Sequence, residues 1–266
     1  MRLVHSFSTK NLSAERLRLH TYYFTVSAIY AKQSGFEIVL HTDNRGARAL
    51  QFAPYDQVYI DLENITIANR IYAWPKFKAM ENEKPESFHI DGDVFIKNPN
   101  ISKYLTFDDC DIIVQNIEIK GVEHWGGLWS ESTQAFARCE YPTWMTRDCT
   151  HMYNCGIIGF KDNNVMKEYH NWYWTLISRY SEKGIDLHSV PDLIAEQQML
   201  YDFCKHKGLK VKELLTFPKL NERADEIGYQ HIIGNAKNTQ LKTCCKLLKK
   251  LDINVYKKLE KLSWDF

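Results

Sequence analysis

Hydrophobic and polar positions alternate along the chain with the two periods that distinguish strands from helices. Short apolar runs at 3–8 and 36–42 predict strands, and the stretch at 13–33 between them predicts a helix. A β-branched run at 57–61 predicts a third strand, and turn residues at 43–46 precede it. Because strands and helices alternate, we expect a βαβ arrangement with a mostly parallel sheet.

The same alternation continues through most of the remaining sequence. Further strands are predicted at 87–90, 111–115, 154–160 and 209–211. Further helices are predicted at 74–81, 163–182, 191–207 and from 239 onward. Segment 121–150 is rich in Trp, Gly and polar residues, so it predicts long loops with a short helix near 131–138. We expect another loop at 229–237.

No internal repeat, low-complexity block or Pro/Gly linker divides the chain. We therefore expect the α/β class, with one Rossmann-like domain at 1–238 in which helices flank a mostly parallel central sheet. Residues 239–266 are expected to form a basic helical tail. In parallel sheets ligands bind beyond the carboxyl ends of the strands, and the turn at 91–93 is expected at such an end.

Charge and cysteine content make several classes of protein unfavourable for this chain. The 34 Lys and Arg residues nearly balance 33 Asp and Glu residues, so no global field favours a nucleic-acid partner. The 7 cysteines have no Cys-x-x-Cys spacing, which favours reduced thiols over a disulfide framework or a structural zinc site. There is no signal-like apolar run at the first residues and no run of about 20 apolar residues elsewhere, so a cytoplasmic protein is expected.

The segment Asp91-Gly92-Asp93 carries the first candidate chemistry. Two carboxylates around a glycine can turn toward one hard cation such as Mn²⁺ or Mg²⁺, whereas the same residues also make ordinary surface turns. The apolar flanks at 88–90 and 94–96 favour the metal site, because two buried carboxylates need a cation or a shifted pKa.

A second group of residues, His231, Gly234 and Lys237, is spaced as a diphosphate clamp. The imidazole would complete the metal coordination, the glycine N–H would bind an oxygen, and the lysine would neutralise a phosphate. The alternative is a core-packed histidine and a solvated lysine.

With these motifs the chain resembles the glycogenin-like and lipopolysaccharide galactosyltransferase family of retaining enzymes, which have the glycosyltransferase A fold. Four landmarks occur in the family order. They are Asp91-Gly92-Asp93, Asn154-Cys155-Gly156, Glu196-Gln197-Gln198-Met199-Leu200, and the spacing of His231, Gly234 and Lys237. Two features depart from the family pattern: Glu196 stands where Asp is usual, and Asn238-Thr239 stands where Pro-Trp is usual.

The resemblance implies a nucleotide-sugar-binding catalytic domain that transfers a hexose from a UDP-sugar to a glycan or lipid-linked acceptor, in polysaccharide or lipopolysaccharide biosynthesis. It implies Mn²⁺, with Mg²⁺ as the alternative, held by Asp91, Asp93 and His231. Gln197 and Glu196 are the candidate catalytic residues. The candidate donor-binding residues are Phe7, Ser8, Lys76, Lys78, Asp91, Gly92, Asn154, Gly156, Gly234 and Lys237.

The stereochemical outcome stays open at this point, although the resemblance favours retention. A retaining route would use the departing phosphate as its base, with Gln197 near the reacting face. An inverting route needs a carboxylate base. The candidates for that base are Glu123, Glu131, Asp148 and Asp192.

Two further surfaces have alternative interpretations. The tryptophans of the loop-rich segment, Trp125, Trp129 and Trp144, would stack on an acceptor sugar or pack in the core. The basic amphipathic tail would lie on the inner face of an anionic membrane or pack on the domain.

Two other functions compete with glycosyl transfer. A nucleotidyltransferase acting on sugar phosphates would need a Gly-rich phosphate loop near residues 6–10, where none occurs. A non-catalytic carbohydrate-binding protein would not require the paired aspartates or the histidine–lysine loop.

Overall fold

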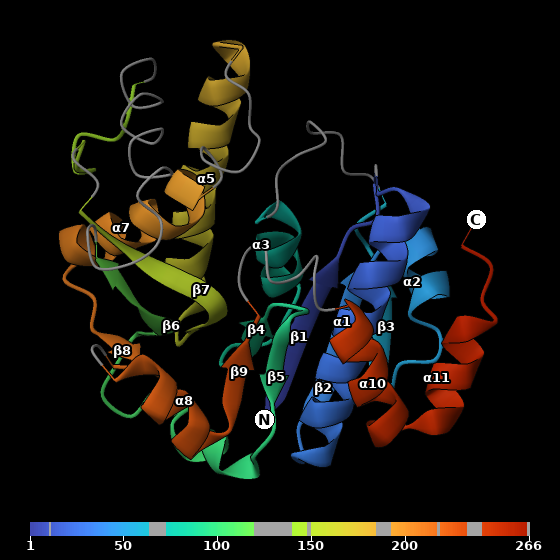
Figure 1. Cartoon of the computed structure of the whole chain (residues 1–266). Helices are drawn as coiled ribbons and strands as arrows, with labels where there is room; N and C mark the ends of the chain where they lie inside the picture. Colours follow the sequence, from blue (N-terminus) through green and yellow to red (C-terminus); the bar gives the residue numbers. More distant parts are fainter. Residues whose placement is uncertain are drawn as a thin grey trace. The chain divides into compact units, whose positions relative to one another are not determined.

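The computed structural model describes residues 1–10, 12–63, 73–119, 140–147, 150–184, 193–216, 219–232 and 241–264. The chain forms two compact units (Figure 1). The first contains Met1–Ile65, Ser87–Leu105 and Asn221–Phe266, and the second contains Thr66–Glu86 and Thr106–Leu220.

The first unit is built on parallel strands in the order β3-β2-β1-β4. These are β1 (Arg2–Phe7), β2 (Glu37–Thr42), β3 (Gln57–Ile60) and β4 (Phe88–Ile90). The pairing of β1 with β2 runs in register from Arg2 opposite Glu37 to Phe7 opposite Thr42. The carboxyl end of β1 therefore lies beside the carboxyl end of β2.

Helix α1 (Ala14–Gln33) connects β1 to β2 and is buried on two sides. It begins at Ser13, whose side chain accepts a hydrogen bond from the Arg16 N–H. One side of α1 packs against residues of β1 and β2, such as Phe7 and Leu40. The other side packs against α10 (Leu241–Leu251) and α11 (Ile253–Glu260), which lie beside it in Figure 1.

A short antiparallel pair in the same unit joins β5 (Val94–Ile96) to β9 (Tyr229–His231). Helix α8 (Leu220–Ile227) leads into β9 through Gly228, which has a φ of 70°. A Cβ at this position would also clash with Asn98, so both conformation and space favour glycine. A 3-10 helix, η1 (Pro99–Lys103), follows β5.

The second unit has strands in the order β7-β6-β8. β6 pairs antiparallel with β7 and parallel with β8. The strands are β6 (Ile112–Ile119), β7 (His151–Phe160) and β8 (Val211–Glu213). The helices are α3 (Trp74–Glu81), α5 (Asn163–Glu182), the π-helix η2 (Ile194–Gln198) and α7 (Met199–Lys207). Apolar side chains of all of these helices share one core with β6 and β7.

The α/β class is confirmed, since the strands of the two units are mostly parallel and helices flank them. Two local expectations were wrong. Residues 229–231 form strand β9 instead of a loop, because their backbone pairs with β5. The turn at 43–46 leads into α2 (Asn44–Ala49), which is capped by Asp43. The helix predicted at 191–207 is confirmed over its described residues 193–207, which include the π-helical turn η2.

The tail is helical as expected, and the domain boundary at residue 238 stays a prediction. The helix expected near 131–138 lies outside the described residues. Within the described part of the chain, no helix combines the length and apolarity required to cross a bilayer.

A buried hydrogen-bond chain crosses the first unit through His5. Its Nδ1 lies 2.8 Å from the Tyr55 hydroxyl, and its Nε2 lies 3.1 Å from Ser27 Oγ. The Ser27 hydroxyl donates to the Val94 carbonyl at 2.5 Å, so it must accept from His5 Nε2–H. Burial lowers the pKa of His5 to about 3, so His5 is neutral near pH 7.

We expect this histidine to make the free energy of unfolding pH-dependent. Below the ordinary histidine pKa of about 6.5, unfolded His5 binds a proton that native His5 does not bind. The unfolding free energy should therefore fall with decreasing pH, by up to about 1.4 kcal/mol per pH unit from this group. In His5→Gln this contribution should disappear, as measured by denaturant titrations between pH 5 and 8.

The two proteins should have parallel pH dependence between pH 7 and 8, where His5 is neutral in both states. Equal slopes below pH 6 would show that His5 does not have a depressed native pKa.

Candidate functional site

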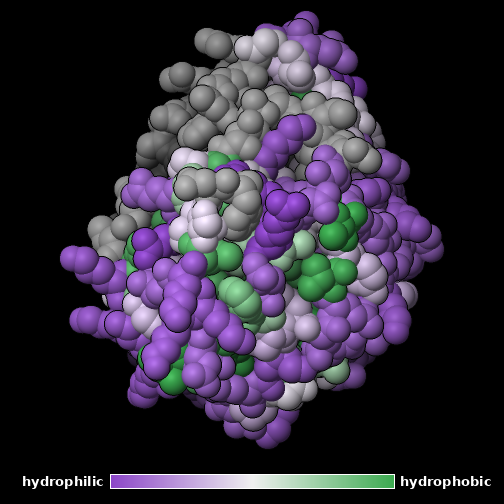
Figure 2. Space-filling model, turned by 90° about the vertical axis from the view of Figure 1, so that its right-hand side faces the viewer, coloured by the Kyte–Doolittle hydropathy of each residue, from purple (hydrophilic) through white to green (hydrophobic). Residues whose placement is uncertain are grey.

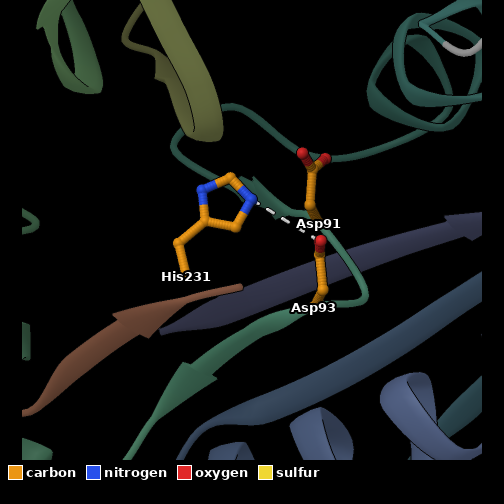
Figure 3. A group of neighbouring side chains, drawn as sticks. All are labelled: Asp91, Asp93 and His231. Carbon is orange, nitrogen blue, oxygen red and sulfur yellow. Dashed lines mark ion pairs between the residues drawn. The ribbon is translucent and has the colours of Figure 1, made fainter. Parts of the chain in front are cut away.

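Asp91, Asp93 and His231 bring three ligand atoms together in the first unit. One atom from each side chain lies within 4.8 Å of the other two, and Figure 3 shows the imidazole turned toward Asp93. The His231 Nε2 is 3.6 Å from Asp93 Oδ1. Asp91 directly follows β4 and Asp93 directly precedes β5, so the group lies at the carboxyl end of a parallel strand.

The shape of the turn between the two aspartates depends on Gly92. A Cβ at this position would overlap the ring of Phe24, which comes from α1. The glycine therefore lets the backbone lie against an aromatic ring. The turn is also closed by a hydrogen bond of 2.9 Å from the Val94 N–H to the Asp91 carbonyl.

Strand β9 delivers the histidine to this turn. Val94 lies opposite His231 in the antiparallel pair, and the Ile232 N–H donates to the Asp93 carbonyl at 3.1 Å. Backbone hydrogen bonds on both strands thus fix His231 beside Asp93, although more than 130 residues separate them in sequence. A residue distant in the chain becomes a neighbour through strand pairing.

The three side chains differ in exposure, which suits a site open on one side. The Asp91 side chain is 32 % exposed, whereas those of Asp93 and His231 are 7 % and 9 % exposed. Burial, followed by the charges of Asp91 and Asp93, raises the pKa of the neighbouring Tyr229 well above its ordinary value. Negative charge is therefore concentrated at this turn.

The chemistry of these donors fits a divalent cation. Two carboxylates and an imidazole suit Mn²⁺, and Mg²⁺ accepts the oxygen donors. A further side chain contacts the group, since His89 Nδ1 lies 3.8 Å from Asp91 Oδ1 and its Nε2 hydrogen-bonds to Ser6 at 2.8 Å. This contact is of the kind that orients a metal ligand.

The second unit contains a buried ion pair between two other predicted residues. Lys76, on α3, is 5 % exposed, and Glu196, on η2, is 8 % exposed. The Lys76 Nζ donates to Glu196 Oε1 at 2.5 Å and to the Cys155 carbonyl at 2.9 Å. Lys76 therefore links α3, β7 and η2 through one ammonium group.

Asn154 and Gly156 on β7 lie in a polar network of the same unit. The Asn154 amide donates to Glu118 Oε1 at 2.7 Å, and its carbonyl oxygen accepts from the Gly156 N–H at 2.9 Å. Both Asn154 and Glu118 are buried. The two strands β6 and β7 thus hold a fixed amide and a fixed carboxylate.

Gln197 follows Glu196 on the π-helical turn. Its Oε1 is buried, and within the described ranges it has no hydrogen-bond partner. A buried carbonyl oxygen without a donor costs free energy, so it is suited to accept a hydrogen bond from a ligand hydroxyl. Single π-helical turns are also frequent at functional sites.

The remaining candidates have varied surroundings. Phe7 is 4 % exposed and packs on Phe24, with a ring-centroid distance of 4.7 Å, while Ser8 is half-buried. Lys78 is half-exposed and pairs with Glu81 at 3.4 Å. Trp144 packs in the second unit against Trp172, Phe203 and His206.

Several candidates lie outside the described residues. They are Gly234, Lys237, Glu123, Glu131, Asp148, Asp192, Trp125 and Trp129.

Sequence reasoning missed two residues that shape these groups. Glu118 had a signal, because polar residues interrupt the apolar strand around it and are nevertheless buried. Phe24 had none, because an aromatic residue within a helix predicts only core packing.

Solved structures of similar architecture show the class of fold. One match is to the galactosyltransferase LgtC, solved in complex with donor and acceptor sugar analogues. This match covers 95 % of the present chain and 96 % of the LgtC chain, at 10 % identity and a TM-score of 0.51. The inositol-1-phosphate CTP transferase from T. maritima matches at 12 % identity, 93 % and 96 % coverage and a TM-score of 0.46. The match with LgtC shows a fold of the glycosyltransferase A type.

The chain itself belongs to the family of unknown function DUF6734, whose model matches residues 1–262. No curated protein matches the chain.

The contact between Gly92 and Phe24 predicts the effect of a single methyl group. Gly92→Ala should lower the free energy of unfolding by about 1–3 kcal/mol, because the added Cβ overlaps a packed ring. In a Phe24→Ala background the same substitution should cost much less. Denaturant titrations of the four proteins give the coupling energy, and additive losses would contradict the contact.

Proposed function

We propose that the chain is a metal-dependent glycosyltransferase that transfers a hexose from a UDP-sugar to a glycan or lipid-linked acceptor. The observation that carries the proposal is the convergence of Asp91, Asp93 and His231 beyond the carboxyl end of β4. In α/β sheets nucleotides bind at this edge. The fold shared with the galactosyltransferase LgtC supports the same class of reaction.

The three side chains would hold a divalent cation, for which Mn²⁺ is the best match and Mg²⁺ the alternative. When bound, this cation supplies Lewis-acid stabilisation of the negative charge on the departing diphosphate. Gly234 and Lys237 are proposed to donate to the same diphosphate, through a backbone N–H and an ammonium group. Phe7 and Ser8, at the end of β1, are proposed to lie near the nucleoside.

The hexose is proposed to meet the polar residues of the second unit. The carboxylate of Glu196 is held in position by Lys76, and the buried carbonyl oxygen of Gln197, which has no partner among the described residues, is an acceptor for a sugar hydroxyl. Asn154 and Gly156 complete this sugar pocket, and Lys78 is proposed to contact the donor from α3. The polar groups of these residues are fixed by hydrogen bonds, which suits a hydroxyl-rich ligand.

The transfer breaks the bond between the anomeric carbon and the diphosphate oxygen and forms a bond to an acceptor hydroxyl oxygen. We propose retention of configuration, with the acceptor proton passing to the departing diphosphate and Gln197 close to the reacting face. Glu196 and Gln197 stabilise the positive charge that develops on the sugar ring through a carboxylate and an amide dipole.

The metal assignment predicts Mn²⁺-dependent release of UDP from UDP-glucose or UDP-galactose. Asp91→Asn and Asp93→Asn should each reduce this release by about 100-fold or more, because a neutral amide stabilises the cation poorly. The measurement is a coupled UDP assay with and without Mn²⁺. Asp225→Asn is the matched control, since this exposed aspartate lies in the same unit on α8.

Unchanged turnover in both variants, or turnover without added metal after chelation, would exclude the metal site. Release of pyrophosphate from a nucleoside triphosphate in place of UDP would instead indicate a nucleotidyltransferase.

The C-terminal helices are proposed to bring the enzyme to an anionic membrane surface that carries a lipid-linked acceptor. Their apolar residues Cys244, Leu248 and Leu259 are buried against α1, so insertion into the bilayer is not required. Hydrophilic side chains predominate on the face that includes α11 (Figure 2). The exposed lysines are Lys242, Lys246, Lys249, Lys250, Lys257, Lys258 and Lys261.

Charge reversal tests this membrane contact without removing packed helices. Replacement of Lys242, Lys246, Lys250 and Lys257 by Glu should lower affinity for phosphatidylserine vesicles by about 10-fold or more, because each lysine near the surface contributes about 1 kcal/mol. Vesicle sedimentation at low salt measures the effect. Reversal of the exposed Lys84, Lys167, Lys183 and Lys210 is the control, and equal losses in both variants would contradict a specific surface.

A further inference from the structure

The π-helical turn η2 contains Glu196 and Gln197 and leads directly into the regular helix α7. The Met199 N–H donates to the Ile194 carbonyl, which lies five residues earlier instead of four. Such a turn displaces the regular hydrogen bonds and leaves carbonyl groups that need other donors. A side chain from another helix supplies one.

Tyr169, on α5, donates its hydroxyl hydrogen to this turn. The hydroxyl oxygen lies 3.1 Å from the Ala195 carbonyl oxygen and also contacts the Glu196 carbonyl. Tyr169 is 0 % exposed, so water does not compete for these carbonyls. The donor is thus directed at the two residues where the helix is widened.

The ring of Tyr169 is held in place by its aromatic neighbours. Its centroid lies 5.3 Å from that of Phe77, at an interplanar angle of 80°. Phe203 and Phe160 contact it at 5.6 and 6.1 Å. The hydroxyl therefore has a fixed position relative to α3, β7 and α7, which carry these three residues.

The extra residue in the π-helical turn changes the directions in which its successive side chains project. Adjacent residues of a regular α-helix project about 100° apart, and one inserted residue rotates the flanking side chains by a similar angle. In η2, Glu196 reaches Lys76 while Gln198 donates to the Thr146 carbonyl at 2.7 Å. Gln197 lies between them with its buried carbonyl oxygen.

We propose that Tyr169 is a positioning residue for the sugar pocket, because its hydroxyl holds the π-helical turn that presents Glu196 and Gln197 to the hexose. This inference rests on the proposed function. The ligand class is the hydroxyl-rich hexosyl part of a UDP-sugar. Tyr169 itself is buried and does not contact the sugar.

The test is Tyr169→Phe, which removes one oxygen atom and keeps the ring packing. The ligand is UDP-glucose or UDP-galactose, and the one chosen must bind wild type more tightly than UDP does. With Mn²⁺ present, the Kd of Tyr169→Phe for this UDP-sugar should be about 10-fold higher than that of wild type. The Kd for UDP should change less than about twofold, because UDP is expected to depend on the residues of the first unit. Calorimetry gives both values, and their ratio separates a sugar-pocket effect from general destabilisation.

The matched control is Tyr180→Phe. Tyr180 lies on the same helix and is also 0 % exposed, but its hydroxyl bonds to that of Tyr141 at 2.5 Å. Loss of this hydroxyl should leave the ratio of the two Kd values unchanged. An equal change in the ratio in both variants would overturn the proposal.

Amide hydrogen exchange of residues 194–200 provides a readout that needs no substrate. Exchange should be faster in Tyr169→Phe than in wild type and unchanged in Tyr180→Phe. Unaltered exchange in Tyr169→Phe would overturn the proposal, as would faster exchange with an unchanged Kd ratio. If wild type binds neither UDP-sugar, the proposed function fails. If wild type binds a UDP-sugar and Tyr169→Phe binds it equally well, only the role of Tyr169 fails.

Discussion

Two carboxylates on either side of one glycine repel each other, and the arrangement of the first unit depends on how this repulsion is accommodated. Asp93 is nearly buried, so solvent screens its charge less than that of Asp91. The backbone nevertheless holds both residues in one turn, through the Val94 N–H and the pairing of β5 with β9. Electrostatic cost at this turn is offset by the hydrogen bonds and ring contact that surround it. A site with this property favours a cation over any neutral ligand.

The second unit also buries charged side chains, but there the charges have opposite signs. Lys76 and Glu196 are both buried, and each charge compensates the other. A buried ion pair contributes little net stability compared with apolar side chains, so its value here is geometric. The ammonium also donates to the Cys155 carbonyl, which fixes the carboxylate relative to β7. The pair thus supplies polar groups at defined positions without a net charge.

The sequence predicted most elements of this fold and the grouping of Asp91, Asp93 and His231, but it did not predict how these three residues are held together. Periodicity identified the long helices α1 and α5 because each repeats its pattern over many residues. It failed for β9, since three residues are too few to show a period and the strand forms only by pairing with β5. The π-helical turn has the composition of an ordinary helix, so only its tertiary contacts reveal it. The approach of Phe24 to Gly92 is likewise a contact between distant segments, which no local pattern encodes.

The order in which segments contribute to the two units has a consequence for biosynthesis. The chain passes between the units at residues 65, 86, 105 and 220, so neither unit is a continuous stretch of sequence. During translation, α1 is made before the second unit, whereas Cys244, Leu248 and Leu259, which cover its tyrosines, are made after it. The nascent first unit therefore carries an uncovered apolar helix face while the whole second unit is synthesised. Transiently exposed apolar surface of this kind favours aggregation of the incomplete chain.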